Sequence, residues 1–145
     1  MSSAPQISTA TRALPHALPP CPNARLALFA VRRMGANGLN DAHVAHAFLN
    51  GFGEAFRRPL VLMRALMADV AATSTCGIAI APCCCRRMTP AEAAIVTVLA
   101  RAETAPESAR LLLADLLGLR RIDGVLASAM AVAIAFADAG RPISA

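Results

Sequence analysis

Apolar side chains recur at intervals of three and four residues along most of the chain. The clearest stretch is 106–117, where five positions follow the i, i+3, i+4, i+7, i+8 order that places side chains on one face of a helix. These positions are Ala109, Leu112, Leu113, Leu116 and Leu117. A second apolar stripe lies within 60–70, with Arg64 on the opposite face, and consists of Leu60, Met63, Leu66, Met67 and Val70. The pattern therefore predicts amphipathic helices that each bury one face.

Two stretches, 77–81 and 129–137, instead alternate with a period of two, which is typical of a strand. In 129–137 the alternating residue is alanine, a strong helix former and a weak strand former. We therefore predict a helix over 129–137. The stretch 77–81 fits either a short extended segment or a loop.

Residues with special roles at helix ends predict where the helices begin and stop. Asn23 and Asn40 are predicted N-caps, and Gly35 is a predicted helix stop. Residues 89–92 (Thr-Pro-Ala-Glu) and 104–107 (Thr-Ala-Pro-Glu) both have the order of a capping box, in which a hydroxyl and a carboxylate satisfy free backbone amides. Together these signals predict five to six helices.

Phe48, Phe52 and Phe56 recur every four residues, which predicts a helix that continues past Gly51 and Gly53 with a kink. Such a stripe is either part of the core or a face on which a partner helix docks. The spacing alone leaves both open.

Residues 1–22 are rich in Ser, Thr, Ala and Pro and show no helical period. This composition predicts a disordered or extended N-terminal arm. Cys21 lies in the arm and is assigned no role. Residues 23–145 then form a single helical domain, so the predicted fold is all-α, a compact bundle of five to six helices preceded by the arm.

All 14 basic residues are arginine, and 9 acidic residues leave a net charge of +5. This excess fits an acidic or phosphate-bearing partner, or simply codon usage rich in G and C. No apolar run reaches the ~20 residues of a membrane-spanning helix, and the first residues lack a secretory signal pattern. We therefore expect no membrane insertion, a cytoplasmic location and reduced thiols.

Four of the five cysteines lie close together in the sequence, and two arginines follow them directly. The cysteines are Cys76, Cys83, Cys84 and Cys85, and the arginines are Arg86 and Arg87. Four thiolates match the number of ligands around a structural zinc ion, but adjacent cysteines rarely face the same ion. The cations instead favour a reactive thiolate and could contact an anion. A third interpretation is that the cysteines pack as small apolar residues.

His43 and His46 could complete a mixed zinc site, but with Asn50 they fall at i, i+3 and i+7, opposite the apolar positions. We therefore interpret them as part of a solvated helix face.

Known enzyme motifs are missing from the sequence, which has no glycine-rich phosphate loop and no Gly-x-Ser-x-Gly turn. In 107–117 Arg110 is the one long polar donor, which argues against sequence-specific recognition of nucleic acid. We predict a non-enzymatic helical interaction or regulatory module, acting on a protein partner or as a homodimer. The alternative is a thiol-redox or zinc-binding protein that uses the cysteine cluster. Small residues that would let two helices approach closely in a homodimer are Ala127, Ala131 and Ala135.

Two segments carry a family resemblance: 58–67 (Arg-Pro-Leu-Val-Leu-Met-Arg-Ala-Leu-Met) and 81–89 (Ala-Pro-Cys-Cys-Cys-Arg-Arg-Met-Thr). They resemble a small uncharacterised bacterial family of helical proteins that carries an Ala-Pro-Cys-Cys-Cys motif, over roughly Ala24 to Ala102. The resemblance implies no established activity and no catalytic residue. It does direct attention to the cysteine segment.

Overall fold

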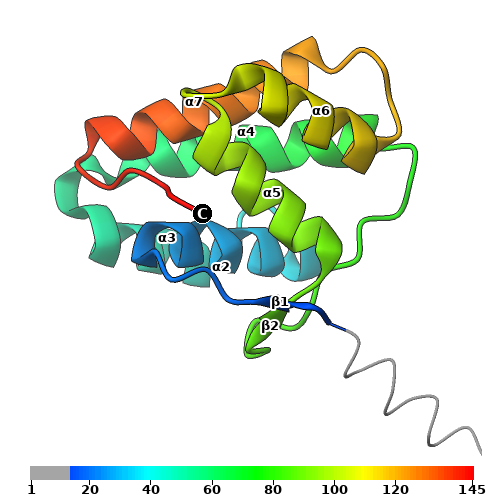
Figure 1. Cartoon of the computed structure of the whole chain (residues 1–145). Coiled ribbons are helices and arrows are strands. Elements are labelled where there is room, and N and C mark those ends of the chain that lie inside the picture. Colours follow the sequence, from blue (N-terminus) through cyan, green and yellow to red (C-terminus); the bar gives the residue numbers. More distant parts are fainter. Residues whose placement is uncertain (1–13) are drawn as a thin grey trace, which may run out of the picture.

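The computed structural model describes residues 14–145, which form six α-helices, one 3-10 helix and a two-stranded sheet (Figure 1). The elements are β1 (His16–Ala17), α2 (Pro22–Asn37), α3 (Ala42–Phe52), η1 (Gly53–Phe56), α4 (Arg57–Thr73), β2 (Arg87–Met88), α5 (Pro90–Arg101), α6 (Pro106–Leu117) and α7 (Asp123–Asp138). The predicted all-α bundle is confirmed, including a helix over 129–137. Within the described residues, none of the helices has both the length and the apolarity needed to cross a membrane.

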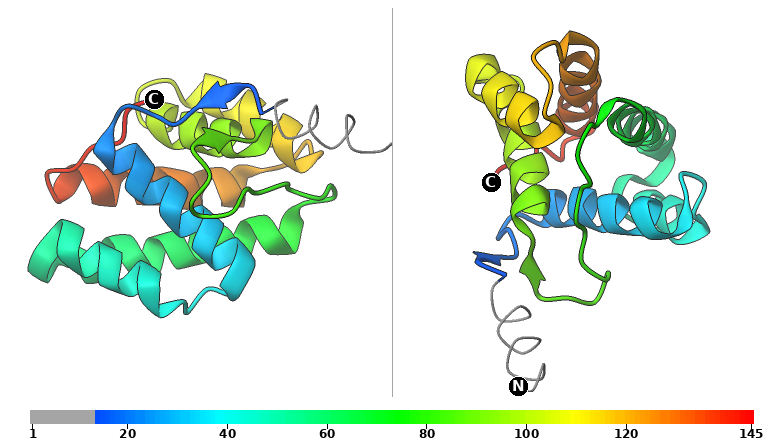
Figure 2. Two further views of the ribbon diagram at one scale, coloured as in Figure 1. Left: turned by 90° about the horizontal axis from the view of Figure 1, so that it is seen from below. Right: turned by 90° about the vertical axis from the view of Figure 1, so that its right-hand side faces the viewer.

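The helices pack in two main pairs, α4 along α7 and α5 against α6. Helix α2 contacts α3, α4 and α5, and α5 crosses it steeply (Figures 1 and 2). The largest fully buried side chains come from every helix in this arrangement. They include Phe48, Met63, Leu99, Leu117 and Phe136.

The phenylalanine stripe belongs to the core. Phe48 is fully buried, and its ring centroid lies 5.5 Å from that of Phe52 and 5.8 Å from that of Phe136 on α7. The expected continuous helix is interrupted, because Gly53 adopts a left-handed φ of 62° and ends α3. The turn η1 then carries the chain to Phe56, which is half-buried against the same core.

Helix α2 continues past the predicted stop at Gly35 and ends at Gly38, where φ is 104°. At Gly35 a Cβ would meet Cδ1 of Ile80, the flexible end of a side chain on the segment 77–81, so this segment lies against α2. That segment is extended but pairs with no strand.

Three predicted caps were wrong in position or kind. Helix α2 begins at Pro22 instead of being capped by Asn23. Helix α3 is capped by Asp41, one residue after the predicted Asn40, because the Asp41 carboxylate accepts hydrogen bonds from two first-turn amides. Helix α6 has Ala105 as its N-cap without any side-chain hydrogen bond, so residues 104–107 form no capping box.

The chain between Leu14 and Cys21 is extended and docks against the domain through the pairing of β1 with β2. This agrees with the predicted extended arm for the second part of 1–22. The prediction for residues 1–13 lies outside the described residues.

Helix α6 offers a matched test of the core. Leu117 is fully buried, whereas Leu111 on the same helix is 72% exposed. Replacing Leu117 by alanine should lower the free energy of unfolding by about 2–5 kcal/mol, because a cavity remains in the core. Leu111→Ala should change it by less than about 0.5 kcal/mol. Urea unfolding followed by circular dichroism measures both, and equal losses would show that the core is misplaced.

Candidate functional site

The four clustered cysteines lie on the long loop between α4 and α5. This loop runs past α2 and turns back before it reaches β2 (Figure 2, right). Its first part is fixed to the C-terminal end of α6, where the Thr75 amide and hydroxyl donate to the Leu117 carbonyl at 3.0 and 2.8 Å. Its second part lies against α2 and α5. The loop therefore connects opposite parts of the bundle.

The three consecutive cysteines lie on a tight turn, residues 82–85, which we call the thiol turn. The amide of Cys85 donates to the carbonyl of Pro82 at 3.0 Å and closes it. Cys83 and Cys84 are exposed and Cys85 is half-buried. The interpretation of the triplet as core packing is therefore wrong for Cys83 and Cys84.

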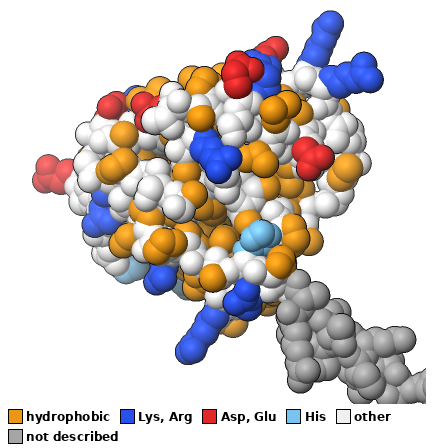
Figure 3. Space-filling model, viewed as in Figure 1, with side chains coloured by type: hydrophobic (Ala, Val, Ile, Leu, Met, Phe, Trp, Pro, Cys, Tyr) orange, Lys and Arg blue, Asp and Glu red, His pale blue; other side chains and the backbone are white. Residues whose placement is uncertain are grey.

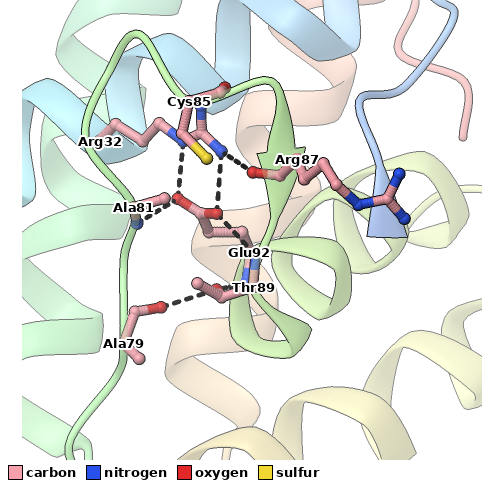
Figure 4. A network of polar contacts seen from close by, with 7 residues as sticks. All are labelled: Arg32, Ala79, Ala81, Cys85, Arg87, Thr89 and Glu92. Carbon is pink, nitrogen blue, oxygen red and sulfur yellow. Dashed lines mark hydrogen bonds and ion pairs between the residues drawn. The ribbon is translucent and has the colours of Figure 1, made fainter. Parts of the chain in front are cut away.

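A buried ion pair lies beneath the thiol turn, on the side of the protein interior (Figure 4). Nε of Arg32 lies 2.7 Å from Oε2 of Glu92, and Nη2 lies 3.0 Å from Oε1. Arg32 is 3% exposed and Glu92 is fully buried. The pair joins α2 to α5 with two parallel bonds, the strong geometry for guanidinium and carboxylate groups.

The same two side chains hold the loop backbone. Arg32 donates from Nη1 to the Cys85 carbonyl and from Nη2 to the Arg87 carbonyl, each at 2.7 Å. Glu92 accepts from the Ala81 amide at 3.0 Å and from the Thr89 amide at 2.9 Å. The thiol turn is thus fixed at both of its ends by buried charges.

The predicted capping box at residues 89–92 is confirmed and forms part of this network. The Thr89 hydroxyl accepts from the Glu92 amide at 3.1 Å and donates to the Ala79 carbonyl at 2.7 Å. Burial alone would raise the pKa of the Glu92 carboxyl, but hydrogen bonds from Arg32 and from the Thr89 and Ala81 amides outweigh it. The pKa of Glu92 therefore lies below its ordinary value.

A second arginine lies beside the thiol turn. Nη2 of Arg33 lies 2.9 Å from Oδ2 of Asp41 and 2.8 Å from Nδ1 of His43. The hydrogen bond to Asp41 raises the pKa of the Arg33 guanidinium against the effect of burial, and the nearby Cys83 side chain adds to the increase. The same bond to Arg33 lowers the pKa of Asp41. Cys83 therefore has a cation as its neighbour, held in place by a carboxylate.

The predicted zinc ligands do not converge. Cys76 lies at the α6 end of the loop, where a Cβ on Gly118 would meet its Sγ at 3.0 Å, whereas Cys83 lies beside Arg33 on α2. Among residues 14–145, no three His, Cys, Asp or Glu side chains are grouped as a metal site. His46 is exposed on α3, as expected for a solvated face. Zinc binding by the cysteine cluster stays a prediction.

The two arginines after the triplet have different surroundings. Arg87 donates from Nε to the Leu14 carbonyl at 2.7 Å and from Nη2 to the Pro15 carbonyl at 2.8 Å. It therefore holds the N-terminal segment onto the domain, next to the pairing of His16 with Met88. Arg86 is exposed. Contact with an anion stays a prediction for both, with Arg86 the better placed.

Sequence reasoning did not find Arg32 or Cys21. The available signal for Arg32 was its position in the apolar stripe of α2, four residues after the buried Leu28. Cys21 is the N-cap residue of α2 and lies against the C-terminal segment. Burial raises the pKa of its thiol, but hydrogen bonds from the Ser144 hydroxyl and from the backbone amides of Ala24, Ser144 and Asn23 lower it to about 7.

Comparison with known proteins yields one match. The model of a family of unknown function, DUF6628, matches residues 6–109, which include the ion pair and the whole cysteine loop. The chain belongs to the DUF6628 family. No curated protein and no solved structure matches the chain. The predicted resemblance to an uncharacterised family is thereby confirmed.

The buried carboxylate of this DUF6628 protein can be tested by substitution. Replacing Glu92 by glutamine leaves Arg32 buried without a counter-charge, so we expect a loss of about 3–5 kcal/mol in the free energy of unfolding. Glu103→Gln is the matched control, because Glu103 is exposed. Chemical unfolding at neutral pH measures both variants. Equal stability of E92Q and wild type would show that the ion pair contributes nothing.

The lowered pKa of the same carboxylate predicts how the stability of the protein changes at acidic pH. As the pH falls through about 4.5, the unfolded chain takes up a proton at Glu92 while the folded protein keeps the carboxylate charged. Stability is therefore lost as the pH falls from there toward the lower pKa of the folded state. Compared with wild type, E92Q should show a shallower decline below pH 4.5, measured from unfolding curves at successive pH values. Parallel declines would contradict the lowered pKa.

The lowered pKa of Cys21 predicts how the rate of its alkylation depends on pH. The rate at which iodoacetamide modifies Cys21 in the folded protein should rise with a midpoint near pH 7, against about 9.0 for an unperturbed thiol. Ser144→Ala should raise the midpoint, because it removes the hydroxyl that stabilises the thiolate. Mass spectrometry of the Cys21 peptide gives the rate. A folded-state midpoint near 9 would rule out the thiolate contacts.

Proposed function

We propose that this protein is a non-enzymatic helical module, with an interaction or regulatory role, that acts through the exposed thiols of the thiol turn. One observation carries the proposal. Cys83 and Cys84 are exposed on a turn whose backbone is bound by a buried arginine. A rigid domain that presents reactive groups on a fixed loop is the usual arrangement of a binding site.

The energetics of the ion pair support this proposal. Removing two charges from water has a penalty of several kcal/mol for each ion, which a pair recovers only through good geometry and further hydrogen bonds. Here the additional bonds of Arg32 and Glu92 go to the loop that carries the thiols. The charges therefore determine the conformation of the thiol turn as well as the packing of α2 on α5.

The charges around the turn indicate the kind of partner. Arg33 lies beside Cys83, and Arg86 follows the triplet directly. These cations attract an acidic surface to the exposed thiols, and thiols react with disulfides by exchange. We propose as partner a protein that carries a cysteine or disulfide among acidic side chains.

Other surfaces support a binding role less well. The phenylalanine stripe packs in or against the core. Of the alanines proposed for a homodimer, Ala127 is exposed and Ala135 is buried. A homodimer therefore stays a prediction without a defined face. On the face shown in Figure 3, hydrophobic side chains occupy much of the surface and basic side chains project separately or in small groups. This arrangement does not form a broad basic surface for nucleic acid.

Two disulfide probes of similar size, one anionic and one neutral, test the proposal. The anionic probe should react faster with the native thiol turn at low salt, and the advantage should shrink at high salt because the charges are screened. Arg86→Gln should reduce the advantage, whereas Arg121→Gln on the remote loop after α6 should leave it unchanged. Release of the probe thiolate gives the rates.

Cys83→Ser and Cys84→Ser identify the thiols that react. Each variant should remove part of the fast phase in the release of the probe thiolate. All of these variants are made with Cys21 and Cys76 replaced by serine, because Cys76 is exposed and Cys21 has a lowered pKa. A fast phase that survives in the double variant, or thiols that react only after unfolding, would reject the thiol turn as the functional surface.

A further inference from the structure

We infer that Cys83 and Cys85 form a redox pair, which a low-molecular-weight disulfide oxidises to an internal disulfide across the thiol turn. The inference rests on the proposed function, because it requires that the turn is accessible to a disulfide reagent. It adds the pairing of the cysteines and the chemical class of the co-reactant. Cys84 takes no part in the final bond.

Backbone geometry selects this pair. Disulfides usually join residues whose Cα atoms are about 4.4–6.8 Å apart, whereas neighbouring Cα atoms across a trans peptide are only about 3.8 Å apart. A bond between Cys83 and Cys84, or between Cys84 and Cys85, is therefore strained. Residues two apart in a turn lie farther from each other, and the described residues contain no cis peptide bond that would change these spacings.

The hydrogen bonds of the turn hold the two cysteines near each other. The Cys85 amide is bound to the Pro82 carbonyl at 3.0 Å, and its carbonyl is bound to Arg32 at 2.7 Å. Cys83 lies within this closed turn and is exposed. Cys76 is fixed at the other end of the loop, by Thr75 on the α6 terminus, and lies outside the turn.

The exposure of the two thiols assigns their order of reaction. Cys83 is exposed, so its sulfur meets the reagent first. Cys85 is half-buried and reacts within the turn. Attacking thiols of redox pairs commonly have this more accessible position.

The reaction balances as two exchanges. The Cys83 thiolate attacks one sulfur of the disulfide RSSR, which forms the mixed disulfide Cys83–SR and releases RS⁻. The Cys85 thiolate then attacks the Cys83 sulfur, closes the internal bond and releases the second RS⁻. Two electrons pass from the cysteine pair to RSSR, and the protons of the two cysteine thiols end on the two RSH molecules.

The disulfide would lie on an exposed turn. Exposed disulfides are typically labile and regulatory rather than structural. An excess of RSH should therefore return the pair to the dithiol, which makes the reaction reversible.

Oxidised glutathione is the probe for the test. All variants are made in the full chain with Cys21 and Cys76 replaced by serine, so that only the turn thiols remain. In this background Cys84→Ser keeps the proposed pair, whereas Cys85→Ser keeps only the adjacent cysteines. Circular dichroism confirms that each variant is folded, and whole-protein mass spectrometry follows the reaction.

We expect Cys84→Ser to lose the mass of two hydrogen atoms without a lasting adduct. This ring closure should be at least about tenfold faster than any ring closure in Cys85→Ser, because a disulfide between adjacent cysteines is strained. Cys85→Ser should accumulate a mixed disulfide with glutathione, and Cys83→Ser should react more slowly at its first step. Ring closure in Cys85→Ser as fast as in Cys84→Ser would overturn the pairing. Stable adducts in both variants would also overturn it while leaving the proposed function intact. Failure of every folded variant to react would reject both proposals.

Discussion

The buried ion pair between Arg32 and Glu92 joins three segments of this structure: α2, α5 and the loop from α4. Helices α2 and α5 cross steeply, and these two charged side chains join them where the loop from α4 returns to the bundle. The guanidinium and the carboxylate each bind the partner charge and two groups of the loop backbone. The position of β2, and through Arg87 the docking of the N-terminal segment, follow from this contact.

Apolar substitutes could not reproduce this arrangement. In other proteins a buried ion pair can often be exchanged for well-packed apolar residues with no loss of stability. Here such an exchange would leave the amides of Ala81 and Thr89 and the carbonyls of Cys85 and Arg87 without their present partners. A buried backbone group without a hydrogen bond has a penalty of about 1–3 kcal/mol. The described residues contain no buried side-chain nitrogen or oxygen atom that lacks a partner.

Local patterns in the sequence predicted the helices well, because each depends on the spacing of its own apolar residues. The confirmed capping box at 89–92 is also a local signal. The features that the sequence could not predict depend on contacts between residues that are far apart in the chain. Gly35 was predicted as a helix stop but lies inside α2, and Cys21 acquires its lowered pKa from Ser144 at the far end of the chain. The backbone of the thiol turn is bound by Arg32, which is 53 residues distant from Cys85.

The sequence separation of the ion pair also determines when it can form during folding. Arg32 and Glu92 are 60 residues apart, whereas α5 and α6 are neighbours joined by a short connection. Closing a long loop loses chain entropy before any contact compensates for it, so local helix pairs have the advantage in early folding. We therefore expect the charged pair to form late in folding, after the transition state. A contact of this kind changes the rate at which the native state unfolds more than the rate at which it folds, so the thiol turn would be among the last segments to become ordered.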